Sequence, residues 1–211
     1  MSAVRRAAVL LLAGPAANGA CPPGVAPAAF ARALAEDVAD LLADLPGLDP
    51  VLAAEPARVA EAEAVRWPDV PVLLIPDRAG APMLLAVLAE LAGRGYTEAA
   101  GGAPDVPDLP GLLVAKPFSA LTGAQVAAGP AVRGGLVVLA SRLPVPGWLA
   151  GLDVHLDCPD AVDRLLAAAG DPADLAVTPG WHRLRTPADL ARLDPALEGW
   201  EATRRLLSGG G

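Results

Sequence analysis

Apolar residues follow two patterns that alternate along the chain. Some form short continuous runs, as at residues 9–13 and 70–75, which is typical of strands buried on both faces. Others recur at helical spacing, as at residues 30–45, where an apolar stripe is expected to face the core. The acidic side chains of that segment are expected outside this stripe: Glu36, Asp37, Asp40 and Asp44.

The same patterns, with proline and glycine as boundaries, predict the remaining elements. Strands are expected at residues 9–13, 50–54, 70–75, 97–101, 125–128, 136–140 and 175–178. Helices are expected at residues 30–45, 56–65, 83–91, 112–121, 161–169, 186–193 and 201–207. The helix at 186–193 has a strong start, because Thr186 can cap it, Pro187 suits its first turn and Asp189 favours its positive end.

Strands that alternate with helices predict a three-layer α/β fold, with a mostly parallel central sheet and helices on both faces. No repeat or linker interrupts the alternation, so residues 1–211 are expected to form one domain, with a loose tail from about residue 208. Ligands of such sheets bind beyond the carboxyl ends of the strands. A site is therefore expected at the loops after the first strand, after Gly101 and at residues 129–135.

Two interpretations fit the first 21 residues. Arg5 and Arg6 precede an apolar run, and small residues lead to Cys21, as in a secretory or lipoprotein signal peptide. The run is short, however, and Asn18 and Gly19 fit a cleavage site badly, so a buried first strand followed by a glycine loop is favoured. No stretch reaches the roughly 18 apolar residues that span a bilayer, so no membrane partner is expected and the expected location is the cytoplasm.

Charge and composition exclude other classes of partner. The net charge is −8 and no basic stripe is visible, so a nucleic-acid backbone is a poor partner. Hydrophobic residues make up 54% of the 211 residues, which is enough for a buried core and argues against disorder. Cys21 and Cys158 lie far apart and form no metal-binding spacing.

The stretch "PDVPDLP" places Asp105 and Asp108 three residues apart, after a predicted central strand. Carboxylates at this position could hold Mg²⁺ or Mn²⁺ together with a substrate phosphate. The spacing alone favours another interpretation, in which Asp108 caps the helix that begins near Pro110 and Asp105 makes a turn with Pro107.

A second candidate is the stretch "GPAVRGG" between two predicted strands. Glycines let a backbone approach a ligand closely, and an arginine can meet a phosphate. By itself this stretch is better explained as a hairpin turn. Its candidate nucleotide-binding residues are Gly129, Pro130, Arg133, Gly134 and Gly135.

The order of these motifs resembles that of the DUF2064 group of nucleotide-diphospho-sugar transferase-like proteins, which have a glycosyltransferase-A (GT-A) type fold. That group shows S-D-x-P-D-L-P, then G-P-x-x-D-G-G-Y, then D-x-D-T-P-x-D-L. Here "DVPDLP" is similar to the first motif, "GPAVRGGL" to the second and "RTPADL" to the third, in the same order.

The resemblance implies a GT-A fold, a nucleotide or nucleotide-sugar as ligand, and transfer of a glycosyl or nucleotidyl group. It also implies Asp105 and Asp108 as metal ligands, with Mg²⁺ or Mn²⁺ as the ion, and assigns no catalytic residue. Three departures leave a second class of function open, a catalytically inactive binding or scaffold protein. The loop after the first strand carries no Lys or Arg, Arg133 replaces an Asp of the second motif, and the Asp residues before "TPADL" are replaced in the region of His182 and Arg185.

Overall fold

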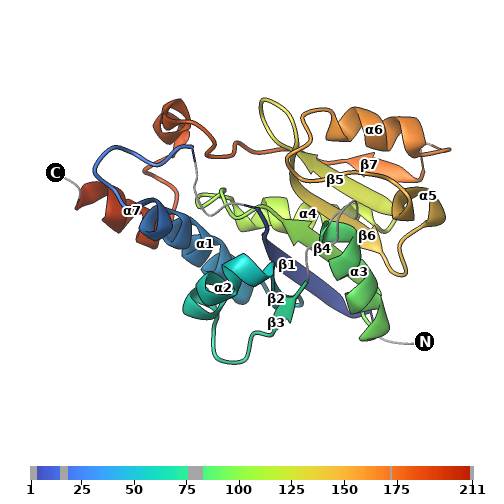
Figure 1. Ribbon diagram of the computed structural model, residues 1–211. Coiled ribbons are helices and arrows are strands. Elements are labelled where there is room, and N and C mark those ends of the chain that lie inside the picture. The colour runs from blue at the N-terminus through green and yellow to red at the C-terminus, as the bar shows by residue number, and fades with distance from the viewer. Residues whose placement is uncertain (1–3, 15–18, 76–82, 172, 210–211) are drawn as a thin grey trace.

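The computed structural model describes residues 4–14, 19–75, 83–171 and 173–209. Part of the loop after the first strand, at residues 15–18, and the last two glycines of the predicted tail lie outside the described residues. Seven strands form one sheet in the order β3-β2-β1-β4-β6-β5-β7 (Figure 1). They are β1 (Arg6–Leu12), β2 (Asp49–Ala54), β3 (Val72–Leu74), β4 (Glu98–Gly102), β5 (Val126–Pro130), β6 (Leu136–Arg142) and β7 (Leu175–Val177).

The predicted α/β fold with a mostly parallel sheet is confirmed. β1 pairs in parallel with β2 and β4, β2 pairs in parallel with β3, and β5 with β7. β6 is antiparallel to both β4 and β5, because residues 131–135 close a tight hairpin that brings β6 back beside β5. The hairpin interpretation of "GPAVRGG" is therefore confirmed.

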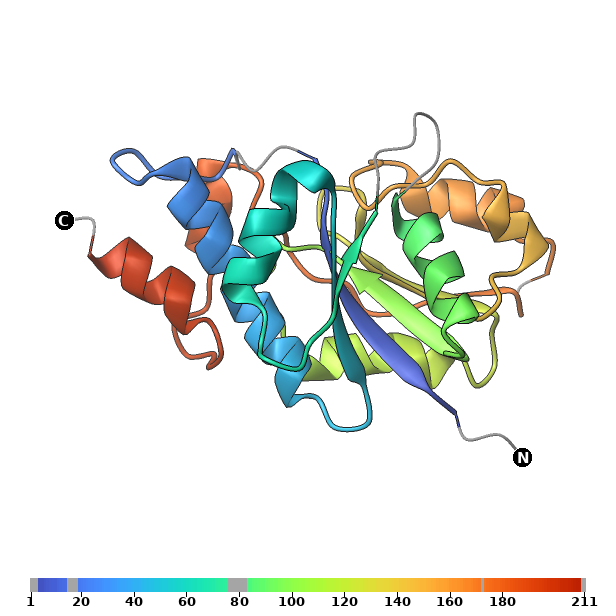
Figure 2. The same cartoon turned by 60° about the horizontal axis from the view of Figure 1, so that its bottom comes forward.

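Helices cover both faces of the sheet, which makes three layers (Figure 1 and Figure 2). On β1, Ala7, Val9 and Leu11 face one side, and the alternate side chains Ala8, Leu10 and Leu12 face the other. The first side is covered by α3 (Met83–Gly93), α5 (Gly147–Ala150) and α6 (Ala161–Ala168). The second is covered by α1 (Pro27–Asp44), α2 (Val59–Val65) and α4 (Gly111–Ala120). Because both faces of β1 are buried, its sequence is a continuous apolar run.

Two predicted helices take a different form. The segment predicted as a helix at 56–65 begins with one turn of 3₁₀ helix, η1 (Pro56–Arg58), before α2. The segment at 186–193 is the 3₁₀ helix η2 (Pro187–Arg192). Thr186 is its N-cap residue, and the carboxylate of Asp189 accepts from the backbone N–H of Thr186 at 2.8 Å. The N-cap at Thr186 was predicted correctly, but the six residues that follow form a 3₁₀ helix and not an α-helix.

The chain after β7 runs back over the ends of several strands. The backbone of Trp181 pairs with Pro130 and Val132 of the hairpin, and the N–H of Leu184 donates to the carbonyl of Asp105 at 2.9 Å. Gly180 has room only for a hydrogen here, because a Cβ would collide with the carbonyl of Pro130. This segment, residues 178–186, therefore forms a cover over the loop that follows β4.

The C-terminal helix α7 (Glu201–Ser208) packs against α1. A residue of α1 caps its first turn: the carboxylate of Asp37 accepts from the N–H groups of Ala202 at 2.8 Å and Thr203 at 2.9 Å. Asp37 is only 1% exposed. The sequence placed Asp37 outside the apolar stripe of α1, and it is buried nevertheless because α7 covers that position.

Candidate functional site

The loop that follows β4 brings Asp105 to the centre of the sheet's carboxyl edge. β4 lies beside β1, whose own carboxyl end leads into the loop that begins at Ala13. Asp105 is 6% exposed, and its Oδ1 accepts from Nε of Arg183 at 2.6 Å. Residues 78 positions apart in the sequence thus form a buried ion pair at the place where this fold class binds ligands.

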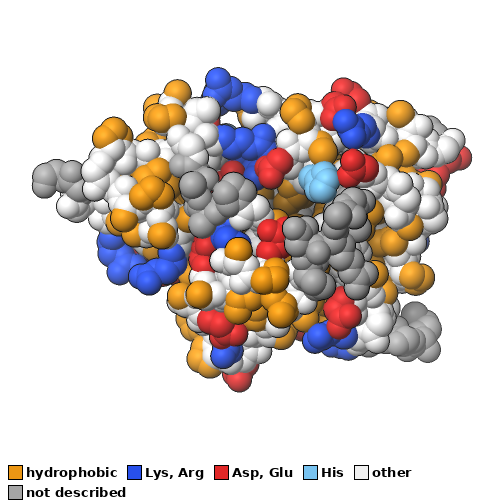
Figure 3. Space-filling view, in the orientation of Figure 1, with side chains coloured by type: hydrophobic (Ala, Val, Ile, Leu, Met, Phe, Trp, Pro, Cys, Tyr) orange, Lys and Arg blue, Asp and Glu red, His pale blue; other side chains and the backbone are white. Residues whose placement is uncertain are grey.

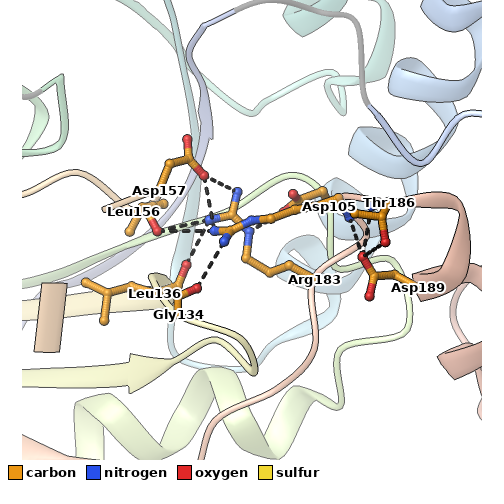
Figure 4. Close-up of polar contacts among 9 residues, drawn as sticks. Asp105, Gly134, Leu136, Leu156, Asp157, Arg183, Thr186 and Asp189 are labelled. Atoms are coloured by element: carbon orange, nitrogen blue, oxygen red, sulfur yellow. Dashed lines mark hydrogen bonds and ion pairs between the residues drawn. The ribbon is translucent and has the colours of Figure 1, made fainter. Parts of the chain in front are cut away.

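The Arg183 guanidinium contacts three other segments of the chain (Figure 4). Besides Asp105, it donates from Nη1 to the carbonyls of Leu136 at 3.0 Å and Leu156 at 3.1 Å, and Nη2 lies 2.8 Å from Oδ1 of Asp157. Its side chain is only 6% exposed. A buried charge needs partners of this number and kind. Arg183 therefore holds the loop after β4, the β5–β6 hairpin and the segment before α6 together.

Asp108 is enclosed by the same cover segment. Its Oδ1 accepts from Nε1 of Trp181 at 3.2 Å, and Nε2 of His182 lies 3.0 Å from that oxygen without hydrogen-bond alignment. Oδ2 receives a long contact from the N–H of Asp194 at 3.5 Å. The expectation that Asp108 caps the next helix is wrong, because the N-cap of α4 is Pro110 and no side chain bonds there. Asp108 ties the C-terminal part of the chain to the loop instead.

The hairpin glycines make room for the protein's own backbone. Gly134 and Gly135 have positive φ angles of 95° and 82°. A Cβ would lie 2.9 Å from the carbonyl oxygen of Pro159 at Gly134, and 2.5 Å from that of Leu156 at Gly135. At Gly129 it would lie 2.7 Å from the side chain of Val138. The close approach expected at these glycines is made by other parts of the chain, and their role in nucleotide binding stays a prediction.

Arg133, the predicted phosphate ligand of the hairpin, has a left-handed backbone with a φ of 77°. Its Nη1 donates to Oδ1 of Asp189 at 3.0 Å, and its side chain is 59% exposed. Burial raises the pKa of Asp189, but the hydrogen bonds from Thr186, Arg185 and Arg133 outweigh this effect, so the pKa lies below its usual value. Arg133 is thus positioned by a buried, ionised carboxylate while more than half of its side chain is exposed.

Arg185 is the second arginine of the cover segment. Its Nη1 donates to the carbonyl of Gly134 at 3.0 Å, and its Nη2 lies 3.2 Å from Oδ1 of Asp157. Burial, followed by the nearby charge of Arg183, lowers the pKa of Arg185. The sequence interpretation missed Arg183, Arg185 and Asp157. The available signal was the "RLR" spacing, because side chains two apart on an extended backbone point to the same side.

The loop after β1 also has a basic neighbour that the sequence did not indicate. Arg58 donates from Nη1 to the carbonyls of Ala13 at 3.2 Å and Gly14 at 3.5 Å, and is itself paired with Glu61. At the other end of the loop, a Cβ on Gly19 would lie 2.6 Å from the carbonyl of Arg185. The loop is therefore held at both ends against the parts of the chain that form the site.

The observed partners bear on the predicted metal site. Among the described residues, no group of three or more His, Cys, Asp and Glu side chains could hold a metal ion. The side chain of Asp108 is fully buried, and Asp105 already faces a cation in Arg183. As they are held here, the two carboxylates do not fit a divalent cation. The assignment of Mg²⁺ or Mn²⁺ to them stays a prediction.

Charged groups gather at this edge of the molecule. Figure 3 shows basic and acidic side chains, together with one histidine, across the upper middle of the face seen in Figure 1.

In the described parts of the chain, no helix is both long and apolar enough to cross a membrane.

No protein-family model and no curated protein matches the sequence. Solved structures do match over almost the whole chain. A nucleotide-diphospho-sugar transferase candidate from Desulfovibrio desulfuricans G20 aligns with a TM-score of 0.69 and 17% identity, covering 97% of each chain. Rv0371c of Mycobacterium tuberculosis H37Rv aligns with a TM-score of 0.58 and 21% identity, covering 99% of this chain and all of its own, and has also been solved as a complex with manganese.

Nucleotidyltransferases with defined activities share the architecture as well. The 4-diphosphocytidyl-2C-methyl-D-erythritol synthase of Anaerococcus prevotii aligns with a TM-score of 0.61 and 10% identity, covering 97% of this chain and 96% of its own. These identities are low, so the likeness concerns the fold. The chain has the fold of the nucleotide-diphospho-sugar transferase-like proteins, which it shares with nucleotidyltransferases.

Proposed function

We propose that this protein binds a nucleotide-activated substrate at the carboxyl edge of β1 and β4 and transfers a glycosyl or nucleotidyl group from it, as a divergent member of the DUF2064 group. One observation carries the proposal. Asp105 is fixed at the carboxyl end of a central strand, in a fold that matches nucleotide-using transferases over nearly the full chain. One such relative, a CMP-2-keto-3-deoxy-manno-octonic acid synthetase, was solved as a complex with CTP.

The charge of the substrate's phosphates needs neutralisation, both for binding and for stabilising the leaving group. The loop after β1 carries no basic side chain of its own, but Arg133 and Arg185 lie at the same edge. Their side chains are 59% and 31% exposed, respectively. The proposal therefore places the phosphates beside the β5–β6 hairpin and the predicted residues Gly129, Pro130, Gly134 and Gly135.

A metal ion is a separable part of the proposal. The manganese complex of Rv0371c motivates it. Mg²⁺ or Mn²⁺ supplies a positive charge that polarises phosphate oxygens when it is bound. For Asp105 to be a ligand here, its contact with Arg183 has to open. A Mn²⁺ requirement that is lost in Asp105→Asn would support this role of Asp105.

The test is a thermal-shift panel of nucleotides and nucleotide-sugars, each with and without Mn²⁺, because a ligand of the native state raises the melting temperature by mass action. Wild type is compared with Asp105→Asn and with the control Asp153→Asn, which removes a 70% exposed carboxylate. We expect a shift for at least one compound class, lost in Asp105→Asn and kept in the control. If no compound at millimolar concentration shifts wild type, the proposal fails.

A binding or scaffold protein without catalysis is the second candidate. The observation that favours it is that both aspartates already have internal partners, Asp105 with Arg183 and Asp108 with Trp181. A binding protein of this kind would shift its melting temperature with a nucleotide-sugar and yet leave it intact. Chromatography of the incubated ligand separates the two candidates. Glycosyl transfer or hydrolysis of a nucleotide-sugar releases a free nucleotide, and nucleotidyl transfer from a nucleoside triphosphate releases pyrophosphate.

The cytoplasmic location expected from the sequence belongs to the same proposal. Fractionation of cells that express the protein would test it.

A further inference from the structure

Two arginines converge on one exposed carboxylate at the candidate site. Nη2 of Arg183 lies 2.8 Å from Oδ1 of Asp157, and Nη2 of Arg185 lies 3.2 Å from the same oxygen (Figure 4). The three side chains differ sharply in exposure, at 6% for Arg183, 31% for Arg185 and 76% for Asp157. The donors are thus embedded in the protein, while the acceptor lies at its surface.

The two donors are held in place by other bonds. The other guanidinium nitrogens of Arg183 bind Asp105, Leu136 and Leu156, and Nη1 of Arg185 binds the carbonyl of Gly134. Both Nη2 groups would therefore keep their directions if Asp157 moved away. Donors fixed in advance lose little freedom when a ligand binds, which favours affinity.

Asp157 has no comparable support. Among the described residues, the contacts of its carboxylate are those to the two arginines, and it lies in a segment between α5 and α6 without regular secondary structure. The side chain of Asp157 is 76% exposed, so water can hydrate this carboxylate when it turns away, while Arg183 keeps its bonds to Asp105, Leu136 and Leu156. The two arginines with Asp105 and Asp157 have no net charge, and without Asp157 they carry one net positive charge.

We propose that the Nη2 groups of Arg183 and Arg185 bind a phosphate group of the substrate, that Asp157 occupies this position as an internal competitor, and that this recognition needs no divalent cation. A phosphate oxygen accepts hydrogen bonds from two guanidinium groups in the same way as the carboxylate does. A metal is not needed, because Arg183 already supplies a positive charge beside Asp105. The inference rests on the proposed function and names the residues that would meet the phosphates.

The test is titration calorimetry with inorganic pyrophosphate in the presence of EDTA. Three variants are compared with wild type: Asp157→Asn, Arg185→Gln and the control Asp153→Asn. The control has the same charge change and lies on the same segment, but its carboxylate pairs with His155 rather than with an arginine. Asp157 and Asp153 are both largely exposed, so neither variant is expected to unfold the protein.

We expect Asp157→Asn to bind pyrophosphate roughly threefold to tenfold more tightly than wild type, as removal of a surface competitor predicts. Asp153→Asn should bind within about twofold of wild type, since a distant surface charge is screened. Arg185→Gln should lose measurable binding. Equal affinities for Asp157→Asn and Asp153→Asn would overturn the inference, and so would pyrophosphate binding that appears only when Mn²⁺ replaces EDTA.

The two proposals fail in different ways. Nucleotide-sugar binding that strictly requires Mn²⁺ keeps the proposed function and refutes the metal-independent phosphate site. Pyrophosphate binding that follows the expected order of variants, without a response to any nucleotide, keeps the phosphate site and refutes the proposed substrate.

Discussion

Removal of the Asp37 carboxylate should detach the C-terminal helix. Asp37 comes from α1 but accepts from two backbone N–H groups in the first turn of α7, those of Ala202 and Thr203. No residue of α7 replaces it, since the N-cap residue Trp200 makes no side-chain cap bond. In Asp37→Ala, two buried donors at the positive end of the helix lose their acceptor.

The magnitude follows from what is lost. A helix cap contributes about 1 kcal/mol and up to roughly 2 kcal/mol. Two hydrogen bonds to a charged group would exceed this, but burial also disfavours the ionised carboxylate and raises the pKa of Asp37. These opposing effects leave an expected loss of about 2 kcal/mol, which corresponds to a fall in Tm of about 4–8 °C for a chain of this size.

Urea denaturation followed by circular dichroism measures the loss, and hydrogen exchange of the α7 amides locates it. The matched control is Asp40→Ala, one turn further along α1, whose carboxylate only accepts from Nε1 of the exposed Trp67. That variant should lose less than about 0.5–1 kcal/mol. If Asp37→Ala and Asp40→Ala are equally stable and the α7 amides stay protected in both, the capping argument is refuted.

Four further predictions concern stability. Gly135→Ala should lower the free energy of unfolding by more than about 2 kcal/mol, because the backbone of Gly135 is left-handed and a Cβ would press on the carbonyl of Leu156. The control Gly123→Ala, with open space around the glycine, should change it by less than about 1 kcal/mol, and urea denaturation measures both. Asp108→Ala should cost about 1–3 kcal/mol, since it leaves the partly buried indole N–H of Trp181 without its acceptor; a smaller loss would mean that water replaces the carboxylate. The pKa of Asp189 is lower in the folded protein than its ordinary value of 3.8, so the ionised carboxylate stabilises the fold above pH 3.8 and this stabilisation is lost as the pH falls through the folded-state pKa. Asp189→Asn should remove this contribution to the loss of stability in acid. Finally, calorimetry should show one cooperative transition, because all seven strands belong to one sheet, and two separate peaks would contradict the single-domain proposal.

Much of the fold was predictable because each element carries its own local signal. The run predicted as a strand at 9–13 corresponds to β1, and the amphipathic pattern at 30–45 corresponds to α1. The place of β6 between β4 and β5 was not predictable in this way, since strand pairing depends on distant parts of the chain. Asp37 shows the same limit, because only the position of α7 decides that this residue is buried.

At the candidate site, local patterns and the family resemblance predicted some residues but not their partners. Asp105 was found from its motif, and it does lie at the carboxyl edge of a central strand. Its partner Arg183 was not found, because a cation 78 residues away leaves no trace near "PDVPDLP". The hairpin glycines were expected to let the backbone approach a ligand, whereas in the structure other parts of the chain lie against them. The sequence does not tell whether a ligand or another part of the chain fills the space.

The route of residues 178–203 has a consequence for synthesis of the protein. The partner of Asp105 lies 78 residues later in the chain, and Ala202, whose N–H donates to Asp37, lies 165 residues after Asp37. A nascent chain emerges N-terminus first, so the ribosome exposes β1, β4 and both carboxylates long before their partners are made. Loops of this length also slow folding. The candidate site should therefore form only after residues 178–186 have been made. A chain whose translation stops before residue 183 should carry the strands of the sheet without an ordered candidate site.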